Sequence, residues 1–328
     1  ICLHNVGFFI KHQYETPSPI SFPPLLNLQS DIDRIEAAED RDVGEYAAQN
    51  WNEFSIYLGG ESKFPNLHKQ IPYPVDDSSI LPFYDLQAFL SSSDNSYLNT
   101  INIIGNPFSY PYKAELMDLL YSIPVKKNFY LTASTACRFI KEIQQIDLPN
   151  YELYIYYEQE EASIHHILTE KQIPFHWIYL ISSEKQYEDL EKLETKYGNE
   201  YVEVHPIYTG DNLPFFEENV YLAEEDILQS NYDKQDIFAH QVMNTNFWGR
   251  LSVLPDGKVY SNLNHPPLGT LKDRVYDLIV DEMTSKRAWR WIRDEVSPCK
   301  DCLFRYLCPS PSNYELVIGK PNLCHVKP

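Results

Sequence analysis

Long apolar runs, glycine and basic side chains are all scarce in this chain of 328 residues. No apolar run approaches the roughly 18 residues of a membrane-spanning helix, so a membrane protein is not expected. The 11 glycines include no glycine-rich phosphate-binding loop. Only 27 Lys and Arg residues oppose 47 Asp and Glu residues, and the net charge of −20 disfavours nucleic acid as a partner. The sequence therefore favours a soluble cytoplasmic protein that is better suited to basic peptide segments.

Cysteine is also uncommon, and its distribution is uneven. Cys2 and Cys137 are isolated, and the other four of the six cysteines lie close together near the C-terminus. A secreted protein stabilised by disulfides would be shorter and would contain more cysteine. The sequence also contains no nucleophile elbow and no His-Glu-x-x-His motif. We therefore expect a reduced compartment and one metal site.

From about residue 53 the sequence alternates between strand-like and helix-like segments. Short segments rich in Ile, Val, Tyr and Phe predict strands at residues 53–58, 100–104, 128–132, 152–157, 175–181 and 201–205. Amphipathic segments predict helices at residues 113–121, 137–146, 162–172 and 184–197. A strand followed by a helix, repeated in this way, predicts an α/β fold with a parallel sheet, as a partial (β/α) barrel. A doubly wound open sheet is the alternative.

The composition changes after about residue 235, where we place a domain boundary. Residues 249–263 predict a hairpin that turns at Pro255, Asp256 and Gly257, and residues 273–283 and 286–294 predict helices. The sequence thus predicts an α/β domain over residues 51–235 and a small C-terminal domain over residues 236–328. Residues 1–50 form an acidic lead-in without an assigned structure.

The four C-terminal cysteines have the spacing of a metal site. Cys299, Cys302 and Cys308 form a C-x2-C-x5-C run, and Cys324 follows after fifteen further residues. Four thiolates suit either a tetrahedral zinc ion or a [4Fe–4S] cluster. Structural zinc sites usually pair two C-x2-C turns, whereas this run has one, and a proline directly follows Cys308 as in ferredoxin-type runs. We expect one [4Fe–4S] cluster, with zinc as the alternative.

Residues 240–328 resemble the SPASM domain, which is the C-terminal extension of radical SAM enzymes that modify peptides. Residues 255–260 match the hairpin of that family, and residues 268–270 match the short turn that follows it. Residues 309–328 further resemble the pseudo-radical-SAM proteins of Bacteroidales peptide-maturation systems. The resemblance implies a degenerate radical SAM-like barrel followed by a SPASM-type domain.

The departures from the SPASM pattern imply one auxiliary cluster. In SPASM domains with two clusters, a second set of cysteines includes one after the hairpin and one beyond the C-x2-C-x5-C run. This chain has Asn262 and Ser312 at those two positions. Because neither side chain replaces a thiolate as an iron ligand, the set of Cys299, Cys302, Cys308 and Cys324 is the complete one.

The catalytic motif of radical SAM enzymes is also absent. Those enzymes carry CxxxCxxC in the loop after the first strand, where a cluster binds SAM, but residues 59–79 contain no cysteine. The second strand of the family typically ends in Gly-Gly-Glu-Pro, and residues 104–107 resemble that element with Asn106 in place of the glutamate. An amide cannot supply the charge of a carboxylate to the SAM amino group.

The resemblance therefore implies no SAM, no catalytic residues, and a non-catalytic accessory subunit of ribosomal-peptide maturation. Its partners would be an active radical SAM peptide maturase and the precursor peptide. An enzyme with non-radical peptide chemistry and a zinc-stabilised binding module are the alternatives.

One basic cluster stands out in this acidic chain. Trp289, Trp291, Arg287, Arg290 and Arg293 combine arginine with tryptophan, as interface hot spots often do. Trp289, Arg290 and Arg293 are thus a candidate partner surface. Pairing of the arginines with nearby acidic residues is the alternative.

Overall fold

The computed structural model describes residues 51–60, 62–92, 97–157, 162–197, 202–285 and 287–326. The predicted lead-in of residues 1–50 lies outside the described residues. The chain forms two compact units. The sheet unit comprises Trp51–Ile207 and Arg250–Val275. The cysteine unit comprises Tyr208–Gly249 and the described residues from Tyr276 onward.

The sheet unit contains a nine-stranded sheet with the order β6-β5-β4-β3-β2-β1-β7-β8-β9. Its strands are β1 (Glu53–Tyr57), β2 (Thr100–Ile104), β3 (Lys126–Thr132), β4 (Tyr151–Tyr156), β5 (Phe175–Ile181), β6 (Val202–Pro206), β7 (Arg250–Val253), β8 (Lys258–Tyr260) and β9 (Gly269–Thr270). Strands β1 to β7 pair in parallel, and β8 and β9 add antiparallel pairs. The six strands expected from the sequence are present, with small differences at their ends.

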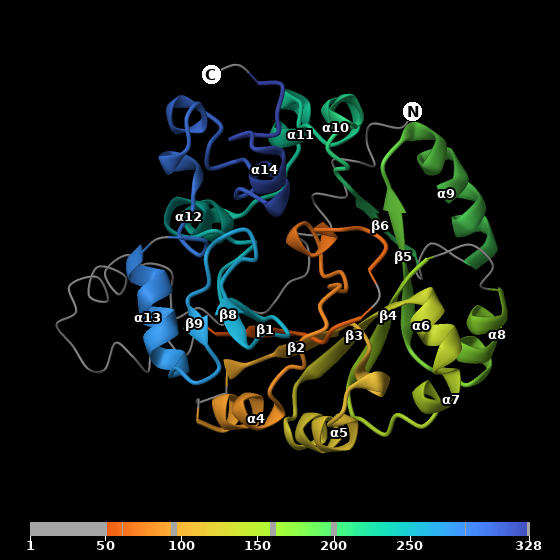
Figure 1. Ribbon diagram of the computed structural model, residues 1–328. Helices are drawn as coiled ribbons and strands as arrows, with labels where there is room; N and C mark the ends of the chain where they lie inside the picture. Colours follow the sequence, from red (N-terminus) through yellow and green to blue (C-terminus); the bar gives the residue numbers. More distant parts are fainter. Residues whose placement is uncertain are drawn as a thin grey trace. The chain divides into compact units, whose positions relative to one another are not determined.

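Strands β1 to β6 lie in the sheet in the order in which they occur in the chain. Because crossover connections are right-handed, an unbroken order places all connecting helices on one face of the sheet. Figure 1 shows this arrangement. The helices are α4 (Phe83–Ser92), α5 (Lys113–Ser122), α6 (Ala133–Arg138), α7 (Ile140–Ile143), α8 (Ala162–Glu170) and α9 (Glu184–Tyr197). A doubly wound sheet would reverse its order and carry helices on both faces, so the sheet is a partial barrel.

The sheet side chains that face the helices form the main core. Phe129 and Leu131 of β3 are fully buried, as are Leu153 and Ile155 of β4. They alternate with residues that point to the opposite face, as the period of two in a strand requires. The six segments form strands because they are rich in β-branched and aromatic side chains, which pack well on a pleated sheet.

Two helical segments differ from the sequence expectation. The predicted helix over residues 137–146 is divided into α6 and α7, because the backbone of Phe139 leaves the helical conformation. Helix α4, which begins at Phe83 directly after Pro82, was not predicted from the sequence.

The cysteine unit consists of short helices and loops. They are α10 (Leu213–Asn219), α11 (Glu224–Leu228), α12 (Lys234–Val242), most of α13 (Val275–Ser285), the 3-10 turns η6 (Arg293–Glu295) and η7 (Cys299–Asp301), and α14 (Asn313–Ile318). The predicted helix over residues 286–294 was wrong, since residues 287–292 form turns and extended chain. The Glu282 side chain accepts the backbone N–H groups of Ala288 and Trp289, both at 2.7 Å, and thereby directs them away from a helical pattern.

The division into units also differs from the predicted boundary near residue 235. Strand β7 pairs with β1, and β8 and β9 continue the same sheet. The hairpin therefore belongs to the sheet unit rather than to the part that carries the cysteines. None of the helices in the described ranges combines the length and the apolarity of a membrane span.

Candidate metal centre

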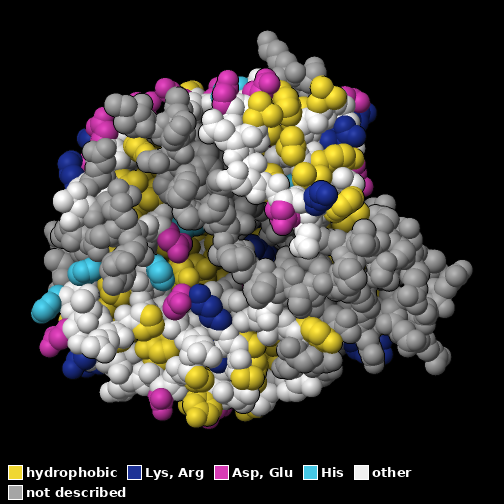
Figure 2. Space-filling view, turned by 180° about the vertical axis from the view of Figure 1, so that it is seen from behind, with side chains coloured by type: hydrophobic (Ala, Val, Ile, Leu, Met, Phe, Trp, Pro, Cys, Tyr) yellow, Lys and Arg dark blue, Asp and Glu magenta, His cyan; other side chains and the backbone are white. Residues whose placement is uncertain are grey.

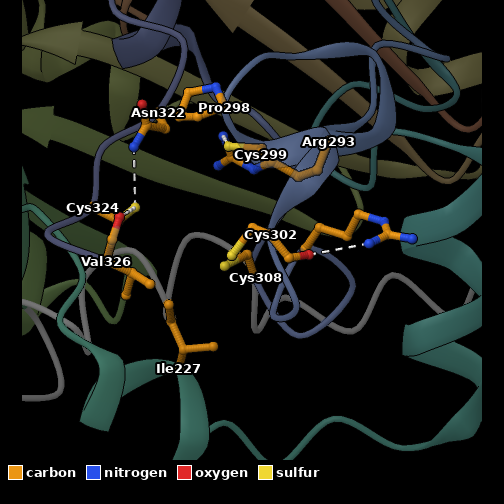
Figure 3. A pocket seen from close by; sticks show the side chains of 10 residues that line it. Ile227, Arg293, Pro298, Cys299, Cys302, Cys308, Asn322, Cys324 and Val326 are labelled. Carbon is orange, nitrogen blue, oxygen red and sulfur yellow. Dashed lines mark hydrogen bonds between the residues drawn. The ribbon is translucent and has the colours of Figure 1, made fainter. Parts of the chain in front are cut away.

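Four cysteines of the cysteine unit line one cavity. Cys299, Cys302, Cys308 and Cys324 surround a space of about 310 Å³ that includes its opening to solvent. Their side chains point into this space (Figure 3). All four are free thiols, so none of them is used in a disulfide. The structure thus brings the four cysteines to one cavity.

The first three cysteines are placed by local turns. Cys299 begins the 3-10 turn η7, and the N–H of Cys302 donates to its carbonyl at 2.9 Å. This closed turn directs the two C-x2-C sulfurs to the same side. A second turn follows, in which the N–H of Cys308 donates to the carbonyl of Phe304 at 3.0 Å.

Cys324 reaches the cavity from the other direction. Its backbone forms an isolated parallel bridge with Leu222. The N–H of Leu222 donates to the carbonyl of Leu323 at 3.0 Å, and the N–H of His325 donates back to Leu222 at 2.9 Å. The final cysteine is thus fixed by long-range backbone bonds, which no local sequence pattern could specify.

The remaining lining of the cavity is apolar except for a few nitrogen donors. Ile227, Pro298 and Val326 contribute apolar surface. The Asn322 amide donates to Cys324 Sγ at 3.1 Å, and the Arg293 guanidinium approaches Cys299 Sγ at 4.0 Å. N–H groups directed at sulfur favour thiolates over thiols, because a thiolate is the stronger acceptor.

Without a bound metal, the cavity disfavours ionised sulfur. Burial raises the pKa of the Cys308 thiol to about 12; the neighbouring cysteines add to this increase, while Arg293 opposes it. Burial also raises the pKa of the Cys299 thiol, again against the effect of Arg293. A bound metal would reverse this balance, since metal ligation requires deprotonated sulfur.

A single zinc ion and a [4Fe–4S] cluster place different demands on the spacing of four sulfurs. Among the described residues, no group of three or more His, Cys, Asp or Glu side chains is arranged to hold one metal ion. A tetrahedral zinc ion would need all four sulfurs at about 2.3 Å from one point. The four corners of a [4Fe–4S] cube are separated, so thiolates that bind a cube stand further apart around a shared space.

Arg293 was expected on a partner surface but lies inside the cysteine unit. Its side chain is 8% exposed and forms an ion pair with the 3% exposed Glu315, with Nη2 and Oε1 2.7 Å apart. Burial alone would lower the pKa of the Arg293 guanidinium, but Glu315 and the cysteines raise it, so the group stays cationic. The expectation of an exposed Arg293 was therefore wrong.

Trp289 and Arg290 are also buried, so the candidate partner surface is not a surface in this structure. Trp289 is 0% exposed and packs against Trp248, with ring centroids 5.6 Å apart. Arg290 is 8% exposed. Arg287 forms an ion pair with Asp281 at 3.0 Å. Pairing with a nearby acidic residue, the alternative considered from the sequence, describes Arg287, whereas Arg293 pairs with the more distant Glu315.

Ser312 and Asn262, the two positions at which the sequence resemblance would place cysteines, both have structural roles. Ser312 is the N-cap of α14, and Glu315 completes a capping box with it. Asn262 belongs to the sheet unit, where its side-chain oxygen accepts the N–H of Asn264 at 2.8 Å.

Sequence reasoning missed the roles of Glu315 and Asn322 near the cysteines. The spacing of Ser312 and Glu315 is a capping-box signal that could have placed the start of α14. The second contact of Glu315, to Arg293, is long-range and has no local signal.

In the sheet unit, the segment that follows β1 covers the face of the sheet opposite the helices. This segment, residues 59–80, is the orange coil above the strands in Figure 1. Leu67, Ile71 and Tyr73 of the segment are at most 3% exposed and pack with Tyr156 and Ile178 of the sheet. The segment therefore fills the space above the carboxyl ends of the strands, where barrels place their active sites.

Polar bonds also attach this segment to its surroundings. The Tyr156 hydroxyl donates to the carbonyl of Pro72, and the Asn264 amide donates to the carbonyl of Lys69 at 2.7 Å. Asn106, at the position where the sequence resemblance would place a glutamate, caps the 3-10 turn η4 (Pro107–Ser109). Its side-chain oxygen accepts the N–H groups of Phe108 and Ser109.

A row of polar side chains crosses strands β3, β4 and β5 on the face of the sheet opposite the helices. Glu152 of β4 accepts from Lys126 at 2.8 Å and from the Tyr154 hydroxyl at 3.0 Å. The Tyr154 ring stacks on His176 with a centroid distance of 5.0 Å. Histidine, acidic and basic side chains lie near one another on the face seen in Figure 2. Because these charges pair within the row, we assign no ligand to it.

Three solved structures are similar to this chain at low identity. SuiB of Streptococcus suis bound to S-adenosylmethionine is 11% identical with a TM-score of 0.44, and the match covers 82% of this chain and 75% of SuiB. SuiB bound to the precursor peptide SuiA is 11% identical with a TM-score of 0.48, over 87% of this chain and 78% of SuiB. The anSMEcpe structure with bound AdoMet is 13% identical with a TM-score of 0.46, over 78% of this chain and 84% of that chain. No protein-family model matches the sequence, and no curated protein matches it.

Proposed function

We propose that this chain is a non-catalytic accessory subunit of ribosomal-peptide maturation that holds one [4Fe–4S] cluster at Cys299, Cys302, Cys308 and Cys324. It would act with an active radical SAM maturase and its precursor peptide. The observation that carries this proposal is the filled space above the sheet. Residues 59–80 contain no cysteine, and they bury Leu67, Ile71 and Tyr73 where a SAM-binding cluster would need room.

The four-cysteine cavity supports the second part of the proposal. Its sulfurs share one space, its walls are largely apolar, and Asn322 and Arg293 direct N–H groups at two of the sulfurs. When bound, a [4Fe–4S] cluster supplies an electron-transfer centre or a structural cross-link between the loops that carry the cysteines. The sequence resemblance to SPASM domains points to the same ligand set.

Metal analysis of anaerobically prepared protein tests the cluster. We expect about four irons and four sulfides per chain, with the broad absorbance of thiolate-bound iron. Cys324→Ala should reduce the iron content strongly, whereas Cys137→Ala is the matched control because Cys137 is exposed and lies outside the cavity. Stoichiometric zinc without iron would instead favour the zinc-stabilised binding module.

Calorimetry with SAM and assay of the reduced protein for 5′-deoxyadenosine test the non-catalytic part. We expect no heat beyond dilution and no 5′-deoxyadenosine above a blank without protein. Formation of this product would refute the proposal and favour an enzyme in its own right.

Reconstitution with the maturase tests the accessory role. The maturase should modify the full-length precursor faster with this protein than without it, and the two proteins should co-elute in gel filtration at micromolar concentration. Equal rates of modification together with separate elution would refute the accessory role while leaving the cluster proposal intact.

A further inference from the structure

Arg293 touches the segments that carry three of the four cysteines. Its Nε donates to the carbonyl of Pro309 at 3.0 Å, directly after Cys308. Its Nη1 donates to the carbonyl of Pro321 at 3.3 Å, three residues before Cys324, and approaches Cys299 Sγ at 4.0 Å. One planar guanidinium therefore ties together chain segments that are separated in sequence, which is a geometry that an ammonium group cannot reproduce.

Glu315 fixes the orientation of this guanidinium. Its Oε1 accepts from Arg293 Nη2 at 2.7 Å, and its Oε2 accepts from the backbone N–H of Ser312 at 2.8 Å. The Ser312 hydroxyl donates to the same Oε2. Both carboxylate oxygens are thus used, and the start of α14 holds the arginine in place from the side away from the sulfurs.

We propose that Arg293 is the positioning residue of the four-cysteine centre, which it holds together and whose electron affinity it raises. This inference rests on the iron–sulfur cluster put forward under the proposed function. Four thiolates give a buried cluster a net negative charge, and each added electron increases that charge. A buried cation with an N–H group near a ligand sulfur stabilises the reduced form more than the oxidised form.

Paired substitutions separate charge from geometry. Arg293→Lys keeps the positive charge but loses the planar fork. Arg293→Met combined with Glu315→Gln removes both charges, so that no buried carboxylate is left without its partner. The matched controls are Arg287→Met and Arg287→Met with Asp281→Asn, because this pair is in the same unit, is partly exposed and does not line the cavity.

Two measurements follow the reconstituted cluster. The first is the rate of iron release to a chelator, and the second is the midpoint potential from a redox titration followed by electron paramagnetic resonance. The double variant at Arg293 and Glu315 should release iron about tenfold faster or more, as expected when a group that orients metal ligands is lost. Its midpoint potential should be more negative than that of the wild type. Arg293→Lys should also release iron faster, but its potential should stay closer to the wild-type value.

The outcomes distinguish this inference from the proposal on which it rests. If the wild type takes up zinc and no iron–sulfur cluster, both the cluster and the role of Arg293 are refuted. If the wild type holds a cluster and the Arg293 variants match it in iron release and in potential, only the role of Arg293 is refuted. Equal changes in the Arg287 controls would also refute it. Should the double variant fail to fold by circular dichroism, the Arg293→Lys variant decides through the same two measurements.

Discussion

Gly105 follows β2 at the point where the chain comes closest to the end of β1. Its φ angle is +111°, and a Cβ at this position would lie 2.0 Å from the carbonyl oxygen of Leu58. The N–H of Leu58 donates to the carbonyl of Ile104 at 2.8 Å, and the N–H of Gly105 donates to that of Tyr130 at 3.1 Å. Glycine is required here because three strand ends converge on backbone bonds that leave no room for a side chain.

We expect Gly105→Ala to lower the free energy of unfolding of the sheet unit by about 2 kcal/mol or more, because it combines a strained φ angle with a clash against backbone. Urea unfolding followed by circular dichroism measures this loss. Gly60→Ala is the control, since its added Cβ would meet no atom nearer than 3.6 Å. Similar losses in the two variants would contradict the explanation.

Single residues of the metal centre differ in how well the sequence predicts them. The four cysteines follow from spacing, because a C-x2-C turn directs two sulfurs to one side. The role of Arg293 does not follow from spacing, because it depends on hydrogen bonds to the carbonyl groups of Pro309 and Pro321 and to Glu315. The combination of Arg293 with Trp289 in the sequence indicated an interface. In the structure both side chains are buried inside the cysteine unit.

At the scale of elements, charged side chains of neighbouring strands are coupled across β3 to β6. Burial alone would raise the pKa of the Glu152 carboxyl, but Lys126, the Tyr154 hydroxyl and His176 together lower it. Burial would likewise raise the pKa of the Glu203 carboxyl, and His205, His176 and Lys126 outweigh that effect. A carboxyl whose pKa is lowered by folding stabilises the folded state while it is ionised.

The sheet unit should therefore lose stability as the pH falls through the lowered pKa values of Glu152 and Glu203. This contribution is complete above the unfolded pKa of about 4.3 and disappears below the folded values. In Lys126→Gln the fall between about pH 5 and pH 3 should be smaller than in the wild type, because the pKa values move back towards the unfolded value. Hydrogen exchange of the β3, β4 and β5 amides in urea at several pH values measures this pH dependence of stability.

Lys192→Gln is the matched control for this pH dependence. Lys192 pairs with Asp189, but the two side chains are 77% and 45% exposed, so solvent screens the pair. Loss of the Lys192–Asp189 pair should leave the hydrogen exchange of β3, β4 and β5 unchanged at every pH. An equal effect of the two lysine substitutions would show that general surface charge, rather than the coupled row, sets the response.

The strands were predictable and some helices were not, for a physical reason. A buried strand in a parallel sheet is a short run of Ile, Val, Phe and Tyr, and such runs are visible in the sequence at β2 and β5. Residues 286–294 have the composition of a helix, yet Glu282 binds the N–H groups of Ala288 and Trp289 and so prevents helical pairing. Tertiary contacts outweighed local propensity there.

At the scale of the whole molecule, the two units differ in how much regular structure surrounds their cores. The sheet unit has a continuous apolar core between β1 to β6 and their helices. In the cysteine unit, turns around Cys299, Cys302 and Cys308 contain little regular structure. A metal centre that joins such turns contributes its binding energy to folding.

Removal of the proposed cluster should therefore affect the units unequally. After treatment with a chelator, amides of α14 and of the turns from Cys299 to Cys308 should exchange about tenfold faster or more, whereas those of β2 and β3 should keep their rates. Hydrogen exchange with mass spectrometry distinguishes the two groups of peptides. Unchanged exchange in the cysteine unit would mean that the centre does not stabilise its loops.

The division of the chain into units could not be read from composition. The hairpin after residue 249 has the turn that the sequence predicts, but its pairing partner β1 begins almost 200 residues earlier, at Glu53. Such a long-range pairing is determined by the fit of β7 against the first strand. The sequence therefore identified the hairpin but not the strand with which it pairs.

The filled space above the sheet has a consequence for redesign. Substituting three cysteines into residues 59–80 would add the letters of a cluster motif without providing a place for a cluster. Leu67, Ile71 and Tyr73 are already packed against Tyr156 and Ile178, so each new ligand would compete with a formed core. A cluster could be placed here only after this volume had been emptied, and emptying it would lower the free energy of unfolding of the sheet unit.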